Sequence, residues 1–216
     1  VTYVGRLDGA LVALPWSEGS FLREVWDTQF YMLDYHANLT TLHGYQSPPW
    51  SWPVVKRPVS YFFDSSGGTY REIMAFGSPF VWWSSLLALV FVGYRWIRAR
   101  SIGSPEGVIL GAFFFTYVPW LVQPTGRAAV FLFYLLPAVP FMCLALAYVA
   151  VRIGDSTEAR LAIGIFAAAT IASFVYFMPL ALNRPISEDQ WRSRIWFENC
   201  TKPEGYEGSP NGWCWI

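Results

Sequence analysis

The residues best suited to bind a ligand lie in one proline-rich stretch, residues 43–58. Its prolines exclude a regular helix or a central strand, because proline lacks the backbone N–H that both require. Aromatic, cationic and hydroxyl groups in one ordered loop suit a ligand with an anionic head, a sugar and an apolar tail. The candidate binding residues of this loop are His43, Tyr45, Ser47, Trp50, Trp52, Lys56 and Arg57.

The cations near this loop each have two interpretations. Lys56 and Arg57 could be attracted to anionic lipid headgroups, or they could recognise a lipid phosphate, for which arginine offers a planar fork of donors. Arg127 is the only charged residue between the second and third apolar runs of the chain. A cation so close to a bilayer is costly unless it is paired or functional. Phosphate binding and structural snorkelling therefore both remain open for Arg127.

The remaining polar residues form no complete catalytic set. The chain has only two histidines, His36 and His43, which are too few ligands for a metal site, so we expect neither a metal nor a cofactor. His43 is expected to hydrogen-bond a substrate or the loop backbone. The carboxylates outside the apolar runs show no acid–base pairing by their spacing, and we expect them to be solvated or salt-bridged surface groups: Asp8, Asp27, Asp34, Asp64 and Glu72.

The composition is that of a membrane protein. Of the 216 residues, 54% are hydrophobic and only 14% are charged, whereas soluble domains carry about 25% charged residues. The net charge is zero and no basic tract is present. Both facts argue against nucleic-acid binding.

Charge-free stretches indicate four membrane spans. They lie between Glu72 and Arg95, Glu106 and Arg127, Arg127 and Arg152, and Arg160 and Arg184. A helix needs about 20 apolar residues to cross the hydrocarbon. Span interiors free of carboxylates argue against an ion-coupled pump. We therefore predict an all-α, polytopic membrane helical bundle over residues 77–184, with spans near 78–96, 106–123, 129–151 and 160–182.

The arginines of the short loops predict the orientation. Arg95, Arg98 and Arg100 follow the first span, and Arg152 and Arg160 flank the link between the third and fourth. The positive-inside rule makes these loops cytoplasmic. The region 1–76 and the tail 185–216 are then extracytoplasmic. A disulfide between Cys200 and Cys214 is plausible in such a tail.

The region 1–76 is too aromatic to be disordered. Leu22, Trp26, Phe30 and Leu33 recur at helical spacing after Ser20, a possible N-cap. They predict an amphipathic helix over about 20–42, lying along the membrane or on a missing part of the protein. Residues 59–71 could form a strand and turn around Gly67-Gly68. Because the chain starts at Val1, we expect it to be the C-terminal part of a longer polypeptide.

Several motifs, in order along the chain, together resemble the protein O-mannosyltransferases. The loop motif is His43-x-Tyr45-x-Ser47-x-x-Trp50-x-Trp52-Pro53 followed by Arg57-Pro58. The entry to the first span, Gly77-Ser-Pro-Phe-Val-Trp82-Trp83, matches the family except that Ser78 replaces an asparagine. Further matches are Tyr117-Val-Pro-Trp120, Arg127, and Phe131 to Phe141, and the tail segments Gln190 to Phe197 and Gly212 to Ile216 resemble the endings of actinobacterial members.

The resemblance implies the C-terminal module of a GT-C type inverting glycosyltransferase. Such enzymes transfer mannose from a polyprenyl-phosphate carrier to Ser or Thr of a translocating polypeptide at the cell membrane. The catalytic acidic residue is then expected in a missing N-terminal half, and this chain alone should be inactive. The implied partners are the polyprenyl-phosphate-mannose donor, the acceptor polypeptide, the bilayer, the N-terminal half and the secretion translocon.

The resemblance also suggests roles for individual residues. Arg127 would contact the donor phosphate, and Tyr45, Trp50 and Trp52 would shape the sugar or acceptor site. Two other functions remain open: a related polyprenyl-phosphate glycosyltransferase with a lipid or polysaccharide acceptor, and a non-catalytic membrane scaffold.

Overall fold

The computed structural model describes residues 4–7, 10–13, 21–122, 129–201 and 208–215. The chain divides into two compact units. One comprises residues 1–40 with 124–127, and the other comprises 41–123 with 128–216.

The smaller unit contains an antiparallel hairpin and a helix. Strand β1 (Val4–Leu7) pairs with β2 (Ala10–Ala13), and helix α1 covers Phe21–Ala37. The sequence placed the end of this helix near residue 42, whereas Asn38 ends it by donating its side-chain amide to the Asp34 carbonyl at 2.9 Å. The apolar residues Trp26, Phe30 and Leu33 are exposed. The predicted cap, Ser20, lies outside the described residues.

The larger unit is built on long apolar helices. They are α2 (Pro79–Ala99), α3 (Pro105–Leu121), α4 (Val139–Ile153) and α5 (Thr157–Ala181), and a 3₁₀ helix, η3 (Leu132–Ala138), leads directly into α4. Each predicted span overlaps one of these segments. Among the described residues, three segments are long and apolar enough to cross a membrane: 79–99, 132–153 and 157–181. Helix α3 has 17 residues, or about 26 Å of helix at 1.5 Å per residue. The helical membrane fold is therefore confirmed.

Local sequence explains where these helices begin. Pro79 and Pro105 occupy the first helical positions of α2 and α3, where the missing N–H is not needed. The Ser104 and Ser156 hydroxyls accept hydrogen bonds from the first turns of α3 and α5. Helix α2 packs against α3, α4 and α5, and Val92 of α2 and Met142 of α4 are fully buried in the hydrophobic core.

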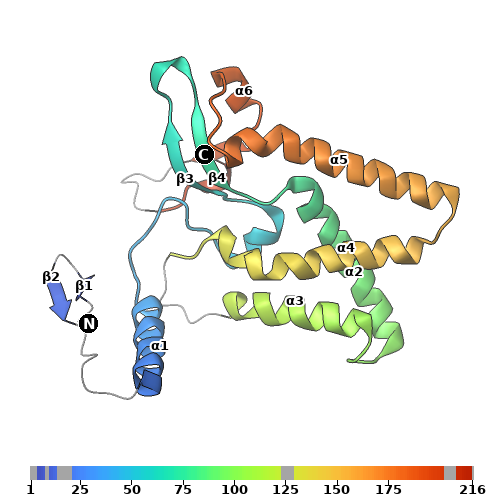
Figure 1. The fold of residues 1–216 in the computed structure, drawn as a ribbon, viewed down its shortest axis with the longest axis horizontal. Coiled ribbons are helices and arrows are strands. Elements are labelled where there is room, and N and C mark those ends of the chain that lie inside the picture. The colour runs from blue at the N-terminus through green and yellow to red at the C-terminus, as the bar shows by residue number, and fades with distance from the viewer. Residues whose placement is uncertain (1–3, 8–9, 14–20, 123–128, 202–207, 216) are drawn as a thin grey trace. The chain divides into compact units, whose positions relative to one another are not determined.

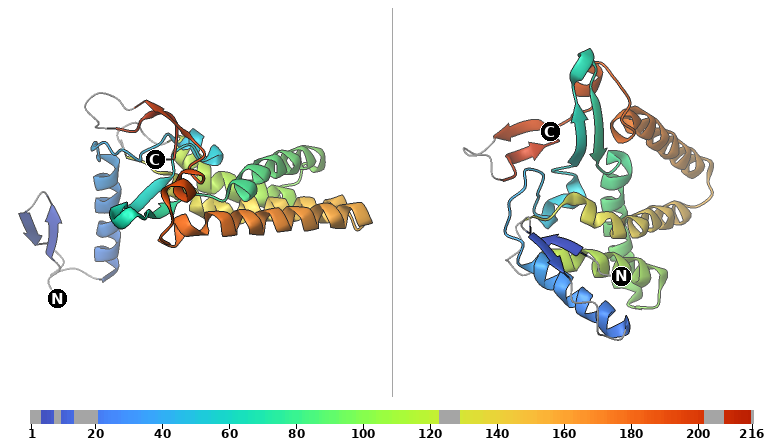
Figure 2. Two further views of the ribbon diagram at one scale, coloured as in Figure 1. Left: turned by 90° about the horizontal axis from the view of Figure 1, so that it is seen from above. Right: turned by 60° about the vertical axis from the view of Figure 1, so that its left-hand side comes forward.

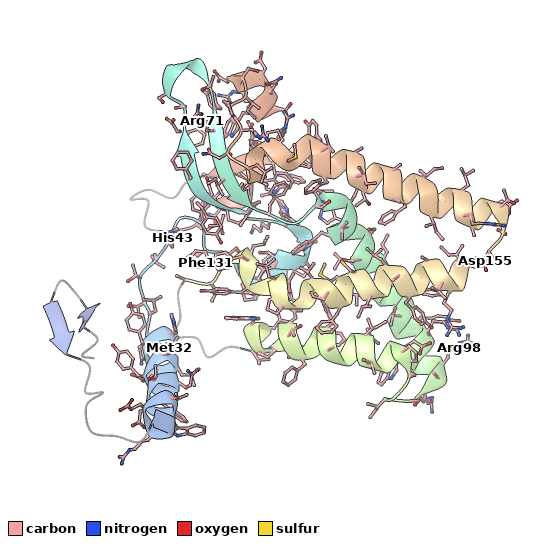
Figure 3. The ribbon with its side chains drawn as sticks, in the orientation of Figure 1. Met32, His43, Arg71, Arg98, Phe131 and Asp155 are labelled. Carbon is pink, nitrogen blue, oxygen red and sulfur yellow. A yellow bond between two sulfur atoms is a disulfide. The ribbon has the colours of Figure 1, made fainter. Side chains whose placement is uncertain are left out.

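The remaining elements of the larger unit form a cap at one end of these helices (Figures 1 and 2). The cap contains two antiparallel hairpins, which pair β3 (Val59–Asp64) with β4 (Arg71–Ala75) and β5 (Glu198–Thr201) with β6 (Asn211–Cys214). It also contains the 3₁₀ helices η1 (Pro49–Val54) and η2 (Ser66–Gly68), and helix α6 (Glu188–Arg192). The strand and turn expected over 59–71 correspond to the first hairpin; the other hairpins were not predicted. His43 and Phe131 lie at the cap end, and Arg98 and Asp155 lie at the opposite end (Figure 3).

Candidate binding site at the proline-rich loop

The loop 43–58 is held by side-chain donors from distant parts of the larger unit. Its prolines and its short 3₁₀ turn leave several carbonyls without helical or sheet partners. In addition to the bonds of the 3₁₀ turn, four carbonyls of the loop accept hydrogen bonds from aromatic side chains. The donor–acceptor pairs are Tyr117 Oη to Pro49 O (2.9 Å), Trp82 Nε1 to Trp52 O (3.0 Å), Trp83 Nε1 to Val54 O (3.4 Å) and Trp215 Nε1 to Val55 O (2.8 Å).

The approach of Trp82 to the loop requires the glycine that precedes α2. A Cβ atom added to Gly77 would come within 1.9 Å of the Trp82 ring. No side chain can be accommodated there without moving the indole. Gly77 therefore allows the Trp82 ring to lie beneath the loop and donate to the Trp52 carbonyl.

Trp52 is the internal anchor of the loop. Its side chain is 0% exposed, and its indole nitrogen donates to both the carbonyl (3.1 Å) and the hydroxyl (3.0 Å) of Ser47. Its ring contacts those of Trp120 and Tyr134 edge to face. The predicted ligand contacts Ser47 and Trp52 are thus both buried, and here they bind each other.

Arg57 is also directed into the protein. Its side chain is 3% exposed, and its Nε and Nη2 atoms donate to the Gly44 carbonyl at 3.1 and 3.0 Å. Its guanidinium carbon lies 4.7 Å from the centre of the half-buried Tyr45 ring, within cation–π range. Arg57, near the end of the loop, thus binds Gly44 and Tyr45 near its start.

His43, Trp50 and Lys56 remain accessible to a ligand. The exposed His43 accepts the Tyr45 backbone N–H at Nδ1 (3.1 Å), an arrangement that the tautomer protonated at Nε2 satisfies. Its second nitrogen can then act as a donor. The Phe131 ring packs against it at 5.2 Å. Trp50 is 59% exposed, and Lys56 is half-buried.

The Lys56 ammonium lies between two indole rings. Its Nζ is 5.2 Å from the ring centre of Trp50 and 5.5 Å from that of Trp213. Both distances are within cation–π range. This cluster combines a positive charge with exposed aromatic surface, which suits an anionic group attached to a sugar.

Val55 has a left-handed backbone in the middle of the site. Its φ and ψ are 55° and 48°, and its side chain is fully buried. For a β-branched residue this is a genuine conformational outlier, costing of the order of 1–3 kcal/mol. Its backbone N–H binds Trp52 O at 3.0 Å, and its carbonyl accepts from Trp215. These contacts hold the turn that separates Trp52 from Lys56.

A buried carboxylate lies elsewhere in the cap. Glu72 of β4 is 2% exposed and accepts a hydrogen bond from Trp191 Nε1 at 2.7 Å. Burial raises the pKa of its carboxyl above the ordinary value. The expectation of a solvated or salt-bridged surface group was therefore wrong for Glu72. Asp64 is close to the solvent, and hydrogen bonds from Ser66 lower its pKa.

Two predicted features have different outcomes in the structure. Cys200 and Cys214 form a disulfide across the β5–β6 hairpin. Arg127 lies outside the described residues, so its role as a phosphate contact stays a prediction. Sequence reasoning did not identify Trp213, Trp215 or Tyr117 as partners of the loop; the tryptophans of the C-terminal segment 212–216 were the available signal.

These elements define a class: a polytopic membrane protein that presents aromatic and cationic groups at one end of its spans. The family model described as the C-terminal four TMM region of protein-O-mannosyltransferase matches residues 21–200. The chain belongs to the protein O-mannosyltransferase family.

Its relatives include two bacterial enzymes, each named polyprenol-phosphate-mannose–protein mannosyltransferase. The Mycolicibacterium smegmatis protein is 26% identical over 89% of this chain, and the Corynebacterium glutamicum protein is 31% identical over 77%. The matched regions cover 40% and 35% of those proteins. The present chain therefore spans well under half the length of these relatives.

A solved structure shares the fold. It is that of the S. cerevisiae protein O-mannosyltransferase Pmt1-Pmt2 complex bound to the sugar donor. Its TM-score is 0.69 with 22% sequence identity, and the match covers 88% of this chain and 28% of the yeast chain.

Proposed function

We propose that this chain is the C-terminal part of an inverting glycosyltransferase that transfers mannose from polyprenyl-phosphate-mannose to Ser or Thr of secreted proteins. The observation that carries the proposal is the loop 43–58, which lies at one end of apolar spans and combines an exposed imidazole, an exposed indole and a half-buried ammonium. Membership of the family and the names of the bacterial relatives support the choice of sugar, carrier and acceptor.

In this proposal the loop binds the head of the donor. A polyprenyl-phosphate sugar has its phosphate at the membrane interface and its tail in the hydrocarbon. Lys56 neutralises the phosphate, and the Nε2–H of His43 donates to it or to the sugar. Neutralising the leaving phosphate lowers the barrier to glycosyl transfer. Trp50 offers its exposed ring face to the sugar. Arg127 is proposed separately, from the sequence, as a contact of the donor phosphate.

The remaining predicted loop residues act as scaffold. Ser47, Trp52 and Arg57 are buried and bind other parts of the loop. They keep the exposed residues at fixed positions, which reduces the cost of ordering them when the donor binds. The catalytic base comes, in this proposal, from the part of the relatives' length that this chain does not span.

We propose that the protein resides in the plasma membrane with the cap on the extracytoplasmic side. Arg98 and the α4–α5 link around Asp155 lie at the end opposite the loop (Figure 3), and the positive-inside rule places that end in the cytoplasm. A disulfide in the cap agrees with an oxidising compartment. The acceptor would then reach the loop from the translocation side, where the secretion translocon delivers it.

The proposal is tested by kinetics of the full-length enzyme in membranes with polyprenyl-phosphate-mannose and a Ser/Thr peptide. Lys56→Ala and Arg127→Ala should each raise the donor KM by roughly tenfold, equivalent to about 1.4 kcal/mol. Arg71→Ala serves as the matched control, since Arg71 is an exposed cation of the same cap on β4. An unchanged donor KM in both the Lys56→Ala and the Arg127→Ala variant would reject the phosphate assignment. Deletion of the gene for the full-length enzyme should abolish the mannosylation of secreted proteins. Loss of a mannosylated lipid or polysaccharide instead would reject secreted proteins as the acceptor.

A further inference from the structure

The C-terminal hairpin reaches back to the loop through successive contacts. The Cys214 backbone N–H donates to the Lys56 carbonyl at 3.2 Å. The next residue, Trp215, donates its indole N–H to the Val55 carbonyl at 2.8 Å. Trp213, the residue before Cys214, places its ring centre 5.5 Å from the Lys56 ammonium. The hairpin therefore contacts both the backbone and the side-chain end of Lys56.

Further contacts hold the two strands of the hairpin. Strands β5 and β6 pair antiparallel, and the Cys200–Cys214 disulfide links them. Trp215 is fully buried. Its ring stacks on that of Trp196 at 5.7 Å, and its backbone N–H donates to the Phe197 carbonyl at 2.9 Å. Trp213 therefore extends from a strand that is paired, disulfide-linked and anchored by the buried Trp215.

This support has a physical consequence for Lys56. A lysine side chain is flexible and loses rotamer freedom when it binds an anion. The Lys56 ammonium contacts two rings, and the Lys56 backbone carbonyl is hydrogen-bonded. The side chain has therefore already lost much of that freedom. Preorganisation of this kind increases affinity without adding a contact to the ligand.

We propose that the C-terminal hairpin is part of the donor site, and that Trp213 is a positioning residue that acts through Lys56. The proposal rests on the function proposed above. It extends the site from the loop to a segment more than 150 residues further along the chain. Trp213 need not touch the donor, and the chemistry it serves is recognition of the sugar-linked phosphate by the ammonium.

A double-mutant cycle in the full-length enzyme tests this role. The variants are Trp213→Ala, Lys56→Met and their combination, with donor KM and kcat measured separately. Trp213→Ala should raise the donor KM about two- to fivefold, the change expected from loss of one cation–π contact near the surface, with kcat within about twofold of wild type. In the Lys56→Met background the same substitution should have no further effect. Trp213→Phe, which retains an aromatic face, should restore the wild-type KM.

The controls separate positioning from folding. Asn211→Ala changes an exposed residue of the same strand and should leave the donor KM unchanged. If Trp213→Ala does not accumulate in membranes, Trp213→Leu replaces it in the cycle, since it keeps apolar bulk without a π face. An unchanged KM in Trp213→Ala, or an equal effect in both backgrounds, would overturn the positioning role alone. An unchanged KM in Lys56→Met would overturn both this role and the proposed phosphate contact.

Discussion

Trp50 and Trp52 lie two residues apart and should respond oppositely to substitution. Trp52→Phe keeps an aromatic ring beside Trp120 and Tyr134 but removes the indole N–H. The buried Ser47 carbonyl and hydroxyl then lose their donor, and an unsatisfied buried polar group costs about 1–3 kcal/mol. Trp52→Ala also leaves a cavity and should cost about 3–5 kcal/mol. Trp50 is 59% exposed, so Trp50→Ala should change stability by less than about 0.5 kcal/mol.

The assay is thermal unfolding of the purified full-length enzyme in detergent, paired with donor kinetics. Trp52→Phe should lower Tm, and Trp52→Ala should lower it further. The donor KM of the folded Trp52→Phe fraction should stay near wild type. Trp50→Ala should leave Tm unchanged and raise the KM for donor or acceptor. A wild-type Tm for Trp52→Phe together with a raised KM would refute the assignment of Trp52 to the scaffold.

Three further predictions concern the cap and its supports. The raised pKa of Glu72 means that its contribution to folding is fully present below the ordinary glutamate value of about 4.5 and is lost as pH rises through the folded-state pKa. Glu72→Gln should therefore raise Tm at pH 7 and weaken the fall of Tm as pH rises above about 4.5. An unchanged pH profile would contradict the burial argument. Replacing Cys200 and Cys214 by serine should destabilise the cap by up to about 3 kcal/mol, the value for closing a loop of this length; free thiols at both positions in non-reducing mass analysis of the wild type would reject the bond. Tyr117→Phe removes the hydroxyl that donates to the loop and should cost about 0.5–1.5 kcal/mol, measured as a Tm decrease; a Tm equal to wild type would show that the loop is not tied to α3.

The helical part of the fold could be predicted because its signals are local. Long charge-free stretches fix the segments that can occupy a bilayer. The charge-free stretches alone placed the spans, and the structure shows that Pro79, Pro105 and Ser156 mark where three of the helices begin. The end of α1 was misplaced because the residues after Ala37 still carry apolar side chains, whereas the helix ends through a hydrogen bond of Asn38 to Asp34.

The division of labour within the loop could not be predicted in the same way. Composition alone made Trp50 and Trp52 equivalent candidates. The two residues differ because one side of the loop faces the helices and the other does not. Hydrogen-bond donors up to 160 residues away, such as Trp215, fix that orientation of the loop. Glu72 was misassigned for the same reason, because its partner Trp191 lies 119 residues further along the chain.

The central claim is that the exposed face of the loop meets the head of the lipid-linked donor. Photoaffinity labelling tests it most directly. The probe is a polyprenyl-phosphate sugar with a photoreactive group on the sugar, applied to the full-length enzyme in membranes and mapped by peptide mass analysis. We predict labelling within residues 43–56, reduced by Lys56→Ala and by excess polyprenyl-phosphate-mannose. Competable labelling elsewhere, with none in residues 43–56, would contradict the claim.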